Sequence, residues 1–190
     1  MLLVLAVLVG GFFCGGSAMA YETPAEMIDA EWLRPHNSDI TGEMVQDCWR
    51  WYGVAPHVML SIIGAETSMG DPMLGGRLIS DGHHNYGCLR FGIHPKCDQL
   101  AVGSVTIAGR DWYSFPSMQN GMMALGRYLK VGPASNPGYY MRCFAANTNW
   151  YRSFARVYYG NVSGLEAYIA NLRAIDSKLI STARANGWLW

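Results

Sequence analysis

The sequence has few charged residues and no excess of either sign. Lysine and arginine number 14, aspartate and glutamate also number 14, and charged residues make up only 15% of the chain. A nucleic-acid-binding protein usually has a basic excess, because release of counterions from the phosphates supplies much of its affinity. The balanced charge therefore argues against nucleic acid as a partner. The rest of the composition, 51% apolar over 190 residues, is globular and predicts one folded domain.

Motifs for metal, phosphate and acyl-transfer chemistry are also missing. There is no Cys-x-x-Cys pair, and the adjacent His83 and His84 cannot both face one ion from a regular helix. The glycines of 103–109 do not form a phosphate loop, and no Gly-x-Ser-x-Gly elbow occurs. We therefore expect no metal site and no cofactor.

No lysine or arginine precedes Arg34, so the N-terminal segment lacks the positive charges of a typical export signal. Its other features are those of a signal: an apolar run over 2–13, then small residues that end in Ala-Met-Ala at Ala20. We expect cleavage after Ala20, with residues 1–20 as the export signal and a periplasmic or extracellular mature protein. The alternative is an uncleaved membrane anchor, for which residues 2–20 are barely long enough.

The cysteine count supports export. Cys14 belongs to the leader, and the other four cysteines form an even set, as is typical of an oxidising compartment. We expect one disulfide between Cys88 and Cys97, which would close a short loop, and by elimination a second between Cys48 and Cys143.

Aromatic residues are abundant, with seven tryptophans and eleven tyrosines. This number suits a cleft that stacks sugar rings on flat apolar faces, in addition to a core. Beyond a lead-in over 21–40, expected to be ordered only in part, residues 41–190 form the predicted domain.

Periodic apolar residues predict mainly helices in this domain. The pattern predicts a mainly α (α+β) fold with one small β-hairpin over 104–115. The predicted helices begin at Pro56, after Pro116-Ser117, near Trp150 and after a capping box over 163–166.

Acidic residues are scarce, so the position of Glu66 is informative. It lies in the last turns of the helix from Pro56, among apolar neighbours and just before a Gly-Asp-Pro break at 70–72. Burial disfavours a charged carboxylate, and the negative potential of a helix C-terminus acts in the same direction, so both raise its pKa. A carboxyl that stays protonated near neutral pH can protonate the leaving oxygen of a glycosidic bond. Alone, this argument does not distinguish a general acid from a surface glutamate.

Four segments, in order along the chain, carry a resemblance to a known family. They are 65–70 (Ala-Glu-Thr-Ser-Met-Gly), 85–92 (Asn-Tyr-Gly-Cys-Leu-Arg-Phe-Gly), 112–117 (Trp-Tyr-Ser-Phe-Pro-Ser) and 157–161 (Val-Tyr-Tyr-Gly-Asn). They resemble the Glu-Thr-x-x-Gly, Asn-x-Phe-Gly-Ile-Lys, Tyr-Pro-Ser and Tyr-Ala-Thr-Asp segments of glucosaminidase-type peptidoglycan hydrolases, a lysozyme-like group. The first also looks like the Glu-Ser segment of lytic transglycosylases. The resemblance implies a lysozyme-like helical domain with a small β-hairpin lobe.

The resemblance also implies roles for five residues. Glu66 takes the position of the general acid. Tyr159 takes that of a catalytically implicated tyrosine, with Tyr158, one residue earlier, as the alternative; otherwise Tyr158 is a substrate-binding residue. Asn85 and Tyr86 fall in a loop that lines the cleft and holds acetamido or hydroxyl groups of the sugar. Core packing is an equally good explanation for the two adjacent tyrosines.

A second carboxylate, as retaining and inverting glycosidases use, is harder to identify. Asp71 and Asp81 follow Glu66, but both lie in turn-like contexts and are interpreted as turn residues. With a single acid, either the 2-acetamido oxygen of the substrate or the 6-hydroxyl of a muramoyl residue attacks. The second route leaves a 1,6-anhydro product.

The sequence thus predicts an exported, metal-independent enzyme that cleaves peptidoglycan glycan strands, of the endo-N-acetylglucosaminidase or muramidase type. The alternative enzyme is a lytic transglycosylase of a secretion or conjugation apparatus, with cell-envelope machinery as its partner. A non-catalytic wall-binding protein is the alternative from another class.

Overall fold

The computed structural model of the chain describes residues 21–93, 95–145, 150–160 and 163–189. The predicted export signal, with Cys14 and the cleavage site after Ala20, lies outside these residues. Among the helices that are described, none has the length and apolar character needed to cross a membrane.

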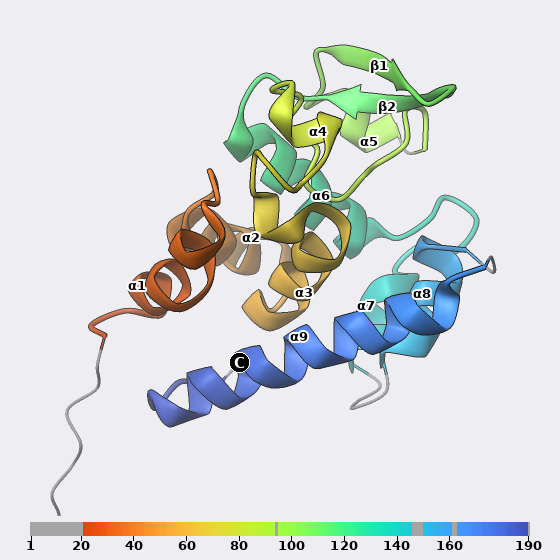
Figure 1. Cartoon of the computed structure of the whole chain (residues 1–190). Helices are drawn as coiled ribbons and strands as arrows, with labels where there is room; N and C mark the ends of the chain where they lie inside the picture. The colour runs from red at the N-terminus through yellow and green to blue at the C-terminus, as the bar shows by residue number, and fades with distance from the viewer. Residues whose placement is uncertain (1–20, 94, 146–149, 161–162, 190) are drawn as a thin grey trace, which may run out of the picture.

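The described residues form a mainly helical domain with one two-stranded antiparallel sheet (Figure 1), which confirms the predicted fold class. The elements in chain order are α1 (Pro24–Ile28), a π-helix (Asp29–Leu33), a 3-10 helix (Arg34–His36), α2 (Gly42–Tyr52), α3 (Pro56–Thr67), a 3-10 helix (Ser68–Gly70), α4 (Arg77–Ser80), α5 (Pro95–Asp98), β1 (Gly103–Ile107), β2 (Arg110–Ser114), α6 (Met118–Val131), α7 (Tyr139–Ala145), α8 (Trp150–Tyr158) and α9 (Leu165–Ala185).

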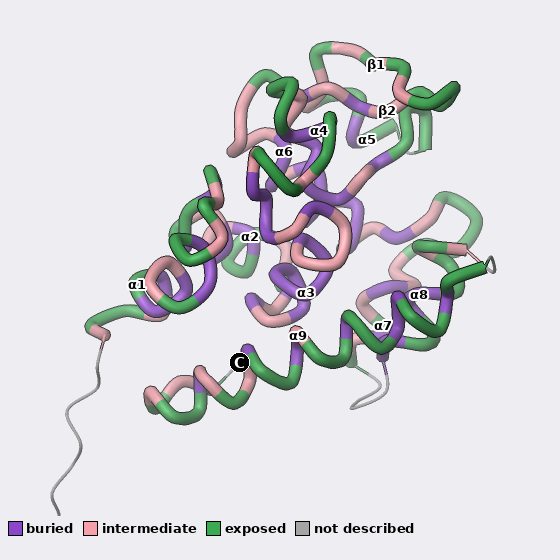
Figure 2. The backbone as a smooth tube through the Cα atoms, viewed as in Figure 1, coloured by how far each residue is buried: buried purple, intermediate pink, exposed green. Residues whose placement is uncertain are grey.

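Helix α3 lies at the centre of the domain. It is apolar almost all round, as expected of a helix that is covered on every side, and Leu60, Ile62 and Ile63 are fully buried. Helix α9 runs across α3, and α2 packs on α3 and on α6. Figure 2 shows the buried residues concentrated on α3 and on the sides of α6 and α9 that face the interior. A side chain near the end of α3 is therefore held by the core.

The β-hairpin forms a small lobe beyond α3 and α6, as Figure 1 shows. Its two strands pair antiparallel, with Val105 opposite Trp112. Ala108 and Gly109 form the turn, with φ angles of 53° and 71°, as a tight two-residue hairpin requires. A bridge between Arg90 and Trp112 joins the preceding loop to the hairpin. The hairpin prediction is confirmed.

Residues 21–40 are helical over most of their length, although the sequence predicts only partial order there. Trp32 and Leu33 are buried, and α1 packs on α2. The two helices approach so closely that a Cβ on Gly42 would lie 2.1 Å from the carbonyl oxygen of Ala25. The expectation fails because apolar side chains of this segment belong to the core.

The start of α9 also differs from its prediction. The residue before the helix is Gly164, with a φ of 95°, and no side chain caps the helix. The carboxylate of Glu166 instead accepts two hydrogen bonds from the guanidinium of Arg152, at 2.6 and 2.8 Å. The predicted capping box is wrong because Glu166 forms an ion pair with Arg152 of the neighbouring helix α8 instead of capping the backbone.

The predicted disulfides are absent as well: Cys48, Cys88, Cys97 and Cys143 are free thiols. The sulfur of Cys88 lies 3.7 Å from a backbone carbonyl of α3, whereas those of Cys48 and Cys97 lie 3.3 and 3.9 Å from carbonyls of α6. The pairings Cys88–Cys97 and Cys48–Cys143 are therefore wrong for this structure. An even number of cysteines does not by itself show that their sulfurs lie close enough to form disulfides.

Candidate active site

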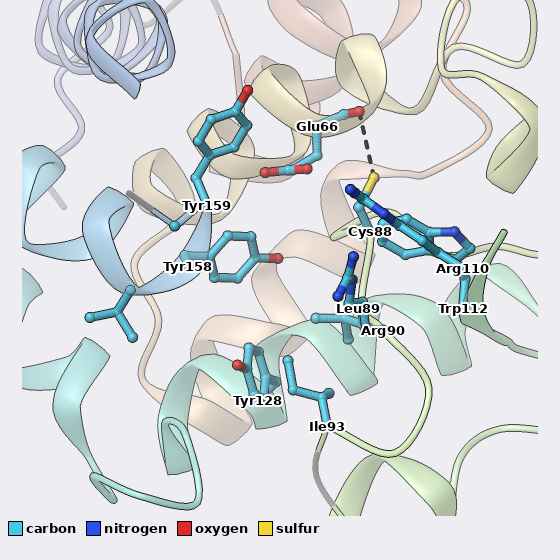
Figure 3. Close-up of a pocket in the computed structure, with 12 residues that line it drawn as sticks. Glu66, Cys88, Leu89, Arg90, Ile93, Arg110, Trp112, Tyr128, Tyr158 and Tyr159 are labelled. Atoms are coloured by element: carbon cyan, nitrogen blue, oxygen red, sulfur yellow. Dashed lines mark hydrogen bonds between the residues drawn. The ribbon is translucent and has the colours of Figure 1, made fainter. Parts of the chain in front are cut away.

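A cavity of about 650 Å³ lies between the helices and the hairpin lobe, and Glu66 is part of its lining (Figure 3). We call one side the helical wall; it consists of Glu66, Tyr128 and 157–160. The other side, the hairpin wall, consists of 88–90, Ile93, Arg110 and Trp112. Three of the lining residues besides Trp112 are tyrosines, in agreement with the predicted aromatic cleft.

A second cavity, of about 390 Å³, adjoins the first. The two share Cys88, Arg110 and Trp112, and the second extends along 75–78 toward the hairpin turn. Together they form a groove with Trp112 at its middle. A groove of this kind can accept a chain of linked units rather than one small molecule.

Glu66 lies on the last turn of α3, where the apolar helix reaches the groove. Burial raises the pKa of its carboxyl above the ordinary value, and hydrogen bonds from the Tyr168 hydroxyl and the Cys88 thiol oppose that rise. The proton is therefore retained at a higher pH than on an exposed glutamate. The position at the end of α3 and the raised pKa agree with what the sequence predicts for the environment of this side chain.

The backbone immediately after Glu66 is unusual. Ser68 and Met69, neither of them glycine, have φ angles of 50° and 64°. Thr67 anchors the end of the helix, because its hydroxyl contacts the carbonyl oxygens of Ile63 at 3.0 Å and of Tyr86 at 3.3 Å. Left-handed conformations of non-glycine residues cost energy and cluster at functional sites.

Tyr168 is the residue that contacts the Glu66 carboxyl most directly. Its hydroxyl donates a hydrogen bond of 2.6 Å to Oε1 of Glu66. The sequence analysis does not identify it as a site residue. The sequence gives no local pattern that predicts the contact between Tyr168 and Glu66, because this contact depends on how α9 crosses α3.

The two adjacent tyrosines at the end of α8, Tyr158 and Tyr159, have different environments. The Tyr158 hydroxyl donates a 2.5 Å hydrogen bond to the carbonyl oxygen of Gly87, and its ring is stacked on Phe154. Tyr159 is 41% exposed, and its ring stacks on that of Tyr168 with 4.4 Å between centroids. Both line the groove, but only Tyr159 has a hydroxyl without a hydrogen bond to another described residue.

Asn85 and Tyr86 do not line the groove, which corrects their predicted role as substrate ligands. Both are 0% exposed. The amide nitrogen of Asn85 donates to the carbonyl oxygens of Leu89 and Tyr113, at 2.9 and 3.0 Å, and its oxygen accepts from the Leu89 backbone N–H at 2.8 Å. Asn85 thus shapes the loop from inside. Gly87, which follows Tyr86, allows the loop to approach Tyr158 of α8 closely. A Cβ at this position would lie 2.8 Å from the Tyr158 hydroxyl oxygen.

Glu66 is the only carboxylate among the described residues that line the groove. Asp71 is buried and accepts hydrogen bonds from the backbone N–H groups of Met73 and Leu74, at 2.7 and 3.3 Å. Asp81 is exposed and pairs with Arg77 at 2.9 Å. Both behave as the turn residues that the sequence predicts.

One buried carboxylate, Asp176, holds the helical wall together from behind. It accepts hydrogen bonds of 2.5 Å from Nδ1 of His57 on α3 and from the hydroxyl of Tyr151 on α8. Because Asp176 is on α9, it joins the three helices that carry Glu66, Tyr158 and Tyr168. No group of described His, Cys, Asp and Glu residues could hold a metal ion.

The fold and the site define a mainly helical domain in which Glu66 is the one carboxyl that the described residues contribute to an aromatic groove. No family model matches the sequence, and no curated protein matches it. Among solved structures, the chain is similar to the catalytic domain of the autolysin Auto from Listeria monocytogenes, at 17% identity and a TM-score of 0.50. The match covers 75% of this chain and 81% of that chain. At this identity, it shows a shared fold.

Proposed function

We propose that this protein cleaves the glycan strands of peptidoglycan, with Glu66 as the general acid. The observation that carries the proposal is the half-buried Glu66 carboxyl, with its raised pKa, in the wall of a groove lined by aromatic rings. The fold shared with the catalytic domain of an autolysin supports the same class of substrate.

Three side chains at or behind the helical wall have tasks in this proposal. Glu66 delivers its proton to the leaving sugar oxygen as the glycosidic bond breaks. The Tyr168 hydroxyl orients the carboxyl and, by donating to its charged form, stabilises the carboxylate left after proton transfer. To Tyr159, which lines the groove, we assign the positioning of an acetamido group or a water molecule.

The single carboxylate favours a route in which the substrate itself supplies the nucleophile. The described lining holds no second acid at the spacing that retaining or inverting pairs use. The 2-acetamido oxygen can attack the anomeric carbon to give a hydrolytic product. Alternatively, the 6-hydroxyl of a muramoyl residue attacks and gives an anhydro end.

The test is a product analysis of purified peptidoglycan digested with the protein. Chromatography and mass spectrometry distinguish a reducing N-acetylglucosamine end, a reducing muramic end and an anhydro-muramic end. Any of these three, absent from an undigested sample, supports glycan cleavage, and the end that appears assigns the bond and the route. Only intact strands, or cuts confined to peptide bonds, would contradict the proposal.

A further inference from the structure

The hairpin wall carries two arginines whose charges nothing in the described structure neutralises. Arg90 and Arg110 are exposed, and both line the groove. Arg50, Arg77 and Arg152, for comparison, each form an ion pair with a carboxylate. In a chain with equal numbers of acidic and basic residues, two unpaired cations in one groove are a local excess of positive charge.

The fold brings these arginines together from different segments. The bridge between Arg90 and Trp112 fixes the loop against the hairpin, and the guanidinium carbon of Arg90 lies 5.7 Å from the centroid of the Trp112 ring. Arg110 comes from the start of β2, two residues before Trp112. Figure 3 shows both guanidinium groups beside Trp112, across the groove from Tyr158.

Neither arginine serves as the counter-ion of Glu66. The groups that shift the pKa of Glu66 besides burial are Tyr168 and Cys88. A guanidinium paired with Glu66 would lower the pKa of the carboxyl and oppose its use as an acid. The two positive charges are therefore available to a ligand. Arg110 lines both cavities, so a ligand that extends through both would pass it.

We propose that Arg90 and Arg110 form a subsite for carboxylates that the muramoyl residues of peptidoglycan carry. The proposal rests on the proposed function and adds to it that the groove selects an anionic glycan over a neutral one. Guanidinium groups match carboxylates in charge and in the geometry of paired hydrogen bonds. The ring of Trp112, which also lines the groove beside Arg90, adds an apolar surface for a neighbouring sugar.

Peptidoglycan has two sources of such carboxylates: the stem peptides and, once these are removed, the lactyl groups. The test uses the full chain with Glu66→Gln, so that binding is measured without cleavage. Co-sedimentation compares intact peptidoglycan, glycan strands stripped of peptides by an amidase, and chitin, which carries no carboxylate. Arg90→Gln and Arg110→Gln are compared with Arg34→Gln, which removes an exposed charge away from the groove lining.

We expect each groove substitution to weaken binding to intact peptidoglycan about tenfold, with a reduced dependence on salt. Arg34→Gln should change it less than about twofold, and chitin binding should be weak and insensitive to all three changes. If stripped strands lose this arginine-dependent binding, the stem carboxylates are the ligand; if they keep it, the lactyl groups are.

Unchanged binding of both variants to intact peptidoglycan would overturn the subsite, as would an equal loss of chitin binding. These outcomes are separate from those of the proposed function. If the protein cuts glycan strands but Arg90→Gln and Arg110→Gln leave binding unchanged, only the subsite is refuted. A chain whose arginines bind carboxylates but that leaves strands intact refutes only the cleavage.

Discussion

The helical wall and the hairpin wall of the groove differ in how their polar groups are satisfied. On the helical wall, the carboxyl of Glu66 and the hydroxyl of Tyr158 have partners within the protein, Tyr168 behind the wall and the Gly87 carbonyl oxygen. On the hairpin wall, the guanidinium groups of Arg90 and Arg110 are exposed and without an anionic partner among the described residues. The first arrangement holds a reactive group in one place, whereas the second leaves charges free for a ligand. We therefore expect damage to the helical wall to affect stability or turnover, and damage to the hairpin wall to affect binding.

The largest effect on stability should come from Asp176. Asp176→Ala removes the acceptor shared by the half-buried His57 and the buried Tyr151, which should lower the free energy of unfolding by about 3 kcal/mol. Denaturant unfolding followed by circular dichroism measures the change. Asp81→Ala, which breaks only an exposed ion pair with Arg77, is the control and should cost less than about 1 kcal/mol. Equal losses for the two variants would contradict the anchoring role of Asp176.

Tyr168→Phe should alter the acid without disturbing the fold. The ring still stacks on Tyr159, but the hydrogen bond to the Glu66 carboxylate is lost. That bond lowers the pKa of Glu66, so its loss raises the pKa further. Because a general acid works in its protonated form, the alkaline limb of the pH–rate profile should move to higher pH. The rate at its optimum should fall about tenfold. An alkaline limb at the same pH as in the wild type would contradict a role for Tyr168 in setting the pKa of Glu66.

Much of this architecture was predictable from local sequence patterns. The apolar helix that ends near Glu66 and the hairpin around Ala108-Gly109 were predicted because each depends on residues close together in the chain. The roles of Asn85 and Tyr86 were not, because only the packed loop shows that both point inward. The contact of Tyr168 with Glu66 spans 102 residues, and it depends on the crossing of two helices. No periodicity encodes such a contact.

Tyr158→Phe and Tyr159→Phe separate packing from chemistry on the helical wall. Loss of the Tyr158 hydroxyl leaves the carbonyl of the buried Gly87 without this donor, which should cost about 1–2 kcal/mol of stability. Loss of the Tyr159 hydroxyl should leave stability within about 0.5 kcal/mol but lower turnover, through a lost hydrogen bond to the substrate or water. Thermal unfolding and peptidoglycan-clearing rates of both variants make the comparison. The reverse pattern would exchange the two roles.

The smallest effect concerns the thiols. Because no disulfide links the four described cysteines, a reducing agent should leave the melting temperature unchanged within about 1 °C. Burial raises the pKa of Cys48 and of Cys97 to about 12, so both are protonated at neutral pH and should be alkylated only after unfolding. Mass spectrometry after alkylation of native and unfolded protein counts the thiols. Fewer than four labelled sites among these cysteines in unfolded, unreduced protein would show that a disulfide forms.

Glu66→Gln tests the central claim most directly. Glutamine keeps the size of the side chain but cannot deliver a proton, so the rate of peptidoglycan clearing should fall by about 100-fold or more. Stability should hold or rise at neutral pH. A carboxyl whose pKa is raised by folding favours the folded state below its unfolded pKa and loses that contribution as the pH rises through its folded pKa. Clearing at a hundredth of the wild-type rate or less, by a variant with an undiminished melting temperature, is the predicted result. Clearing near the wild-type rate would contradict the assignment of Glu66 as the acid.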